Sequence, residues 1–133
     1  MAVTHSTAAR NAATDAVTLQ IGTAARLKFH ITGSTVAAPS ATVANLAMTS
    51  NANGGFGASA TGTATAAAIT SDTNATGNAS AVAFASIQTS GGTAVIHCAV
   101  AASASDINMT NGLTVASGDT VSCSSLTYTA LSA

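Results

Sequence analysis

Charge is the property that this sequence has least of. Its 133 residues include three basic and four acidic side chains, with no tryptophan, and 5% of the chain is charged. An ordinary soluble domain is ~25% charged. Nucleic-acid-binding proteins need a positive surface and often stacking aromatic rings. This chain has one close basic pair, Arg26 and Lys28, together with three Phe and one Tyr. The sequence therefore argues against nucleic acid as a partner.

Long apolar runs are also absent. The mean hydropathy of +0.44 comes largely from alanine, and no stretch approaches the ~18 consecutive apolar residues of a membrane span. Residues 1–5 (MAVTH) lack the basic segment that opens a signal peptide, and no apolar stretch follows them. We therefore expect synthesis in a cytoplasm without a signal peptide, and no membrane as a partner.

The low content of large apolar residues raises the question of disorder. Leu, Ile, Val and Phe together number 24 of 133 residues. Disordered chains combine poor apolar content with high net charge, whereas the net charge here is −1. Because Thr and Val also favour strands, we expect a folded chain. Its length fits a single domain spanning residues 1–133.

Small residues dominate the composition of the chain, since Ala, Thr and Ser contribute 33, 22 and 16 residues. Free soluble domains usually carry far more surface charge, so a surface of this kind suits packing against other protein. The core is also thin, and small domains with weak cores often gain stability from assembly. The composition favours an assembled structural protein over a free enzyme.

Residues 4–21 are predicted to form the one helix of the domain. Thr4 or Ser6 can cap its N-terminus, and Gly22 can end it in the left-handed conformation. The helical spacing of apolar residues predicts a buried face, with Arg10 and Asn11 on the outer side. That face consists of Ala9, Ala13, Ala16 and Val17.

Residues 25–129 are predicted to form an antiparallel β-sandwich or barrel of about seven to eight strands. The segments are short, rich in β-branched residues and bounded by turn residues. They cover residues 25–32, 43–49, 62–70, 79–88, 93–101 and 120–129, with short pieces between 107 and 115. A turn at residues 33–35 and an extension at 36–38 precede Pro39, which stops the pairing. A bulge is expected near Ser124 and Ser125, where the alternation changes face.

The strand at residues 25–32 has the clearest alternation of apolar and basic residues. One of its faces is expected to pack in the core, and the other, basic face is expected to be exposed to solvent or to contact a partner. The predicted core face carries Leu27, Phe29 and Ile31, and the other face carries Arg26, Lys28 and His30. The full predicted core comprises Leu27, Phe29, Ile31, Phe84, Ile96, Val100 and Val121. In the glycine-rich loop of residues 50–57, Phe56 is expected to anchor the loop to the core, because the Walker spacing is absent.

No catalytic constellation is visible. His5, His30 and His97 are scattered, with no acidic partner nearby in sequence. Cys98 and Cys123 lack the spacing of a metal site. Free thiols are favoured over a disulfide in a chain made in a cytoplasm, but the sequence leaves open whether the two cysteines are bonded. It also leaves open whether Cys98 pairs with a histidine in space.

The acidic residues Asp72, Asp106 and Asp119 have the setting of turn and capping residues. We therefore predict no catalytic, cofactor-binding or metal-binding residues, no cofactor and no enzyme activity.

Three stretches resemble a group of small virion proteins of tailed bacteriophages. They are residues 4–17 (THSTAARNAATDAV), 68–77 (AITSDTNATG) and 117–129 (SGDTVSCSSLTYT), and the similarity spans most of the chain. The resemblance implies a virion structural protein of the capsid decoration, or head cement, type. It carries no binding residues with it.

The expected function is to decorate and stabilise a capsid surface through contacts with the major capsid protein and with copies of itself in a homo-oligomer. The alternative is a tail, neck or head-fibre module that binds a host receptor or a glycan. The expected contact elements are the helix and the strand at residues 62–70, because small side chains permit close backbone approach. With so few charges, such contacts should depend little on salt.

Overall fold

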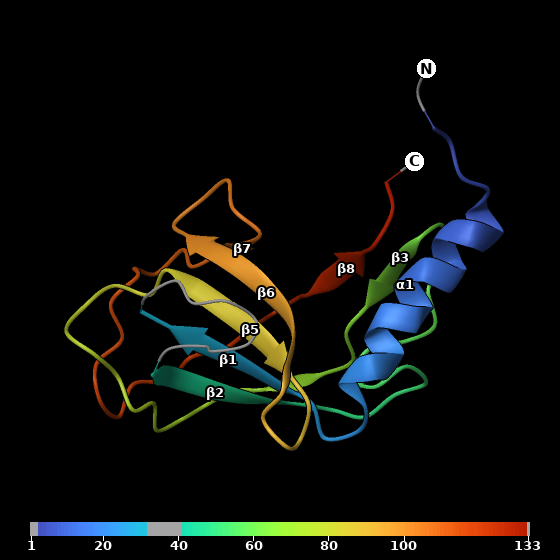
Figure 1. Cartoon of the computed structure of the whole chain (residues 1–133). Helices are drawn as coiled ribbons and strands as arrows, with labels where there is room; N and C mark the ends of the chain where they lie inside the picture. The colour runs from blue at the N-terminus through green and yellow to red at the C-terminus, as the bar shows by residue number, and fades with distance from the viewer. Residues whose placement is uncertain (1–2, 32–40, 133) are drawn as a thin grey trace.

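The computed structural model describes residues 3–31 and 41–132, and within them the chain forms one helix and eight strands (Figure 1). The elements are α1 (Thr7–Ile21), β1 (Arg26–His30), β2 (Thr42–Met48), β3 (Thr63–Thr65), β4 (Ile69–Thr70), β5 (Phe84–Gln88), β6 (Ala94–Ala101), β7 (Ile107–Asn108) and β8 (Thr127–Thr129). Six strands form a large sheet in the order β4-β2-β1-β5-β6-β7, and β3 pairs with β8 in a small one. The predicted class, a mainly β fold of the sandwich or barrel type with one N-terminal helix, is confirmed. The turn and extension predicted up to Pro39 lie outside the described residues.

The helix α1 begins after Ser6, one of the two predicted capping residues, and ends before Gly22, as predicted. The side-chain oxygen of Ser6 accepts a hydrogen bond from the Ala9 amide at 3.2 Å, so Ser6 is the N-cap. Gly22 follows the last turn with a φ of +71°, and its amide donates to the carbonyl of Leu19. The helix therefore starts a few residues later than predicted and ends at the predicted residue.

The buried face of α1 differs from the prediction. Thr14, Thr18 and Ile21 are buried, whereas Ala9 and Ala16 are exposed. The Thr14 hydroxyl donates to the Gly62 carbonyl at 2.6 Å and accepts from the Ala130 amide at 3.1 Å. Backbone groups of this kind need partners when they are buried. The helix therefore turns hydrogen-bonding side chains inward and leaves Ala9 and Ala16 outside, while Ala13 and Val17 of the predicted face are half-buried.

Two further polar side chains, Asn11 and Asp15, fasten the same face of α1 to the loop before β3. The side-chain oxygen of Asn11, which was predicted to lie outside, accepts from the Gly62 amide at 2.7 Å. A carboxylate oxygen of Asp15 accepts from the Asn53 side chain at 2.6 Å and from the Ser59 amide at 2.9 Å. The helix is thus held by these polar contacts together with the buried Ile21, and it lies beside β3 at one end of the molecule (Figure 1).

The central strand β1 pairs with β2 on one side and β5 on the other, and the predicted burial of Leu27 and Phe29 is confirmed. The prediction that the other face of β1 is exposed to solvent is wrong at His30, which is fully buried. Its Nε2 lies 2.8 Å from the hydroxyl of Ser86, and the Gln88 side chain donates to that hydroxyl at 2.8 Å. Hydrogen bonding of this kind offsets the loss of water around a buried polar ring.

The β5–β6 hairpin is confirmed, with residues 89–93 as its turn. The prediction that Phe84 belongs to the core is wrong, because Phe84 is half-buried and lies on the sheet face opposite to Ala85 and Ile87. Its ring stacks on the His97 ring instead, with 5.3 Å between the centroids.

Two predicted strands are broken in the structure. Residues 62–70 divide into β3 of the small sheet and β4 of the large sheet, because the chain crosses between the sheets. Of residues 120–129, β8 alone is a strand, so the segment at Ser124 and Ser125 is irregular instead of a bulge. Since β7 is the one short strand between residues 107 and 115, most of the segment from 109 to 126 crosses the molecule without joining a ladder.

The core lies between the sheets and under the crossing segment. Of the predicted set, Leu27, Phe29, Val100 and Val121 are buried, while Ile31 and Ile96 are partly buried against them. Several fully buried side chains were missed, namely Ile21, Val43, Leu46, Val82 and Ile87. Phe56 is fully buried, as its predicted anchoring role requires.

Candidate functional sites

The histidines and cysteines do not form a catalytic pair. His97 and Cys98 are consecutive on β6, so their side chains leave opposite faces of the strand. His5 is exposed near the N-terminus, and the described contact of His30 is with Ser86. No group of three or more His, Cys, Asp or Glu side chains in the described part of the chain is placed to hold a metal ion.

Both cysteines carry free thiols in the structure. Burial, together with the nearby Asp106 carboxylate, raises the pKa of the Cys98 thiol to about 11. Burial also raises the pKa of Cys123, against a smaller opposing effect of the Ser125 backbone. Because the thiolate is the reactive form of cysteine, both thiols are poor nucleophiles at neutral pH.

The raised pKa of Cys98 predicts an alkaline loss of stability. The folded-state pKa of about 11 lies above the ordinary value of 9.0. The neutral thiol therefore stabilises the fold fully below pH 9, and this contribution is lost as the pH rises through about 11. We expect the free energy of unfolding to fall by about 1–2 kcal/mol more in the wild type than in Cys98→Ala over this range, allowing for solvent around the partly exposed thiol.

Urea denaturation at several pH values between 8 and 11 checks this expectation, and the Cys98→Ala variant retains Cys123 as an internal control. Parallel pH dependences of the two proteins would contradict the assigned environment of Cys98.

The aspartates have structural roles, as predicted. Asp72 accepts from the Asn45 and Asn74 amides, at 2.9 and 3.0 Å. The carboxylates of Asp106 and Asp119 accept from the amides of Ala99 and Ala116, at 2.9 and 2.8 Å. Each of the three carboxylates is therefore used to hold a loop or strand end.

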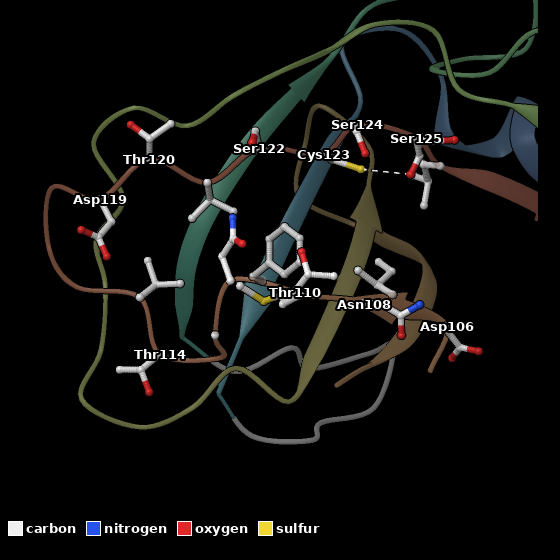
Figure 2. Close-up of a pocket in the computed structure, with 18 of the residues that line it drawn as sticks. Asp106, Asn108, Thr110, Thr114, Asp119, Thr120, Ser122, Cys123, Ser124 and Ser125 are labelled. Carbon is white, nitrogen blue, oxygen red and sulfur yellow. Dashed lines mark hydrogen bonds between the residues drawn. The ribbon is translucent and has the colours of Figure 1, made fainter. Parts of the chain in front are cut away.

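A groove of about 550 Å³ lies where residues 106–127 cross the inner face of the large sheet. Figure 2 shows the labelled side chains of the crossing segment around the groove, with strands of the sheet behind them. Phe29 of β1 lines its floor, and hydroxyl and amide side chains line much of its wall. The groove is not predicted from the sequence, because the pattern of residues 120–129 favours one continuous strand. The signal that was present is the run of Thr, Ser and Asn from 108 to 125.

The outer face of α1 is the second candidate, and it is a surface instead of a pocket. It carries Ala8, Ala9, Ala12, Ala16 and Leu19, all exposed and none charged. Leu19 is 54% exposed, and Val3, just before the helix, is 77% exposed; these are the large exposed apolar residues of the described chain.

Comparison of the chain with protein-family models, with curated proteins and with solved structures found no match. Within residues 3–31 and 41–132, no helix has the length and apolar character needed to cross a membrane.

Proposed function

We propose that this chain is a non-enzymatic structural protein of a bacteriophage virion, which decorates and stabilises the capsid by contacts with the major capsid protein and with copies of itself. The observation that carries the proposal is the outer face of α1, which is apolar, uncharged and made of four alanines and Leu19. Small side chains let another backbone approach closely. The resemblance of residues 4–17 to phage virion proteins supports the class of protein proposed, a virion structural protein.

The polar contacts of the opposite face of α1 support the proposal further. Asn11, Thr14 and Asp15 hold the helix to the loop before β3 and to the C-terminal strand region. The helix is therefore fixed in place before any partner binds. A rigid surface loses less conformational entropy on binding than a mobile one, so α1 is suited to bind an existing lattice.

The strand predicted as a second contact element is now a poorer candidate. Ala64 is buried, and Ala66 packs partly against the core. A charge at Ala66 would thus disturb folding as well as binding. Ala68 remains exposed, but the outer face of α1 offers the cleaner test.

The test uses phage particles that carry the chain, and it measures by sedimentation how much protein stays on them. Because few charges are available for the interface, rising salt should release little protein. The Ala12→Glu and Ala16→Glu variants should each be retained at least ~10-fold less, because each would bury an unpaired carboxylate in the interface. Thr73→Glu, in an exposed loop, is the matched control and should be retained normally.

Circular dichroism and thermal melting of the isolated variants separate a binding defect from misfolding. Release of the wild type at moderate salt, or normal retention of both α1 variants, would refute the proposed interface.

A further inference from the structure

The groove under the crossing segment is a preformed site, and we infer that it binds a neutral saccharide. Its volume of about 550 Å³ lies in the ~300–1,000 Å³ range of small-molecule sites. The wall comes from residues 106–112, 114–115 and 119–127, and no residue of α1 takes part. The inference is therefore independent of the capsid contact proposed for the helix.

The hydrogen-bonding groups of the groove favour a ligand rich in hydroxyls. Thr110, Thr114, Thr120, Ser122 and Ser124 are among the residues that line the groove, and no hydrogen bond joins their side chains to another described residue. Each hydroxyl can donate one hydrogen bond and accept two. Sugar hydroxyls have the same dual capacity, so a saccharide can pair with these groups in several arrangements.

The charges of the groove disfavour an anionic ligand. Asp106 and Asp119 line it, and among the described residues no Lys or Arg does. Each carboxylate accepts one backbone hydrogen bond, from Ala99 or Ala116, which leaves lone pairs for donors on a ligand. A phosphate or a sialic acid would be repelled by these carboxylates, whereas a neutral sugar would donate hydrogen bonds to them.

The apolar residues of the groove argue against a protein segment as the occupant. Protein partners gain most of their binding energy from large side chains that fill apolar pockets. Phe29, Val115 and Val121 line the groove but are already buried by the fold. Ile107 and Met109 are partly exposed there, but they alternate along the chain with Asn108 and Thr110, so the remaining apolar surface is interrupted by polar groups. Recognition here depends on hydrogen bonds, which a small polyhydroxylated ligand supplies at lower entropic cost than an extended chain.

The test is a nitrogen–proton NMR titration of the full chain with glucose, galactose, N-acetylglucosamine and maltose, each up to roughly 20 mM, which covers millimolar dissociation constants. We expect saturable shifts that concentrate on residues 108–125 for at least one of these sugars. The exposed-hydroxyl variants Thr110→Val and Ser122→Ala should each weaken that sugar's binding about fivefold, because each removes a hydrogen bond to the ligand. Thr73→Val, outside the groove, should leave it unchanged.

Two anionic probes, N-acetylneuraminic acid and glucose 6-phosphate, test the charge argument and should bind more weakly than the neutral sugars. The inference is overturned if none of the four neutral sugars gives saturable shifts, or if both groove variants bind as the wild type does. It is overturned equally if an anionic probe binds as tightly as the best neutral sugar.

Discussion

The Gly77→Ala variant is expected to lose about 3–5 kcal/mol of its free energy of unfolding. This loss is the sum of two costs, that of a left-handed backbone in a residue with a Cβ and that of an overpacked contact. Gly77 has a φ of +71°, a conformation that residues with a Cβ rarely adopt. A Cβ at this position would overlap the backbone atoms of Ala116 and Ser117. Because backbone cannot swing aside as a flexible side chain can, the two segments would have to separate.

The contact at Gly77 joins three parts of the chain. The Gly77 amide donates to the Val43 carbonyl at 3.0 Å, and the next amide, of Asn78, donates to the Val115 carbonyl at 2.8 Å. The Gly118 amide returns a hydrogen bond to the Ala75 carbonyl at 2.9 Å. Separation at Gly77 would therefore release the crossing segment that roofs the groove.

Gly118→Ala is the matched control for this prediction. Gly118 also has a positive φ, +87°, but a Cβ there would meet no atom within 4 Å. It should show only the conformational cost of about 1–2 kcal/mol. Urea denaturation measures both variants, and equal losses would show that close packing at Gly77 contributes nothing.

The Phe56→Ala variant should lose about 3–5 kcal/mol of stability, the usual range for removing a buried phenylalanine. Phe56 is 0% exposed and belongs to the main core cluster. Its backbone exchanges hydrogen bonds with Asn53 at 2.9 and 3.1 Å, which closes the loop that holds α1. The mutation therefore leaves a cavity beneath a tightly bonded loop that has little freedom to collapse into it.

Phe84→Ala is the matched control, because it makes the same substitution at a phenylalanine that is less buried. The half-buried Phe84 ring has water on part of its surface and stacks on His97, so its loss should be about 1–2 kcal/mol. Thermal melting and urea denaturation of both variants test the assignment. A larger loss for Phe84→Ala than for Phe56→Ala would contradict the core described above.

The elements that could be predicted from the sequence are those specified by neighbouring residues. The cap at Ser6, the end of α1 at Gly22 and the β5–β6 turn each depend on residues within a few positions. The burial of Leu27 and Phe29 followed from strict alternation in β1. Local backbone preferences and side-chain periodicity are sufficient for such features.

The predictions that proved wrong were those in which the polarity of a side chain alone decided whether it lies on the buried or the exposed face of its element. His30 was placed with Arg26 and Lys28, yet it is buried because Ser86 of the neighbouring strand supplies a partner. Ala9 and Ala16 of α1 are predicted to lie inside but are exposed, and Thr14 lies inside because Gly62 and Ala130 present backbone groups. In both cases the partner is far away in sequence, so no local pattern could reveal it.

The groove could not be predicted for the same reason. Its lining joins Phe29 of β1 to hydroxyls of a segment about eighty or more positions later, and a run of Thr and Ser favours a strand as readily as an irregular wall. By itself the sequence determined the class of fold, the helix and the turns, because short-range sterics and periodicity specify them. Which polar groups are buried, which alanines are exposed and where the surface is hollow were decided only by the tertiary structure, because each depends on hydrogen bonds and packing between segments that meet only in the folded chain.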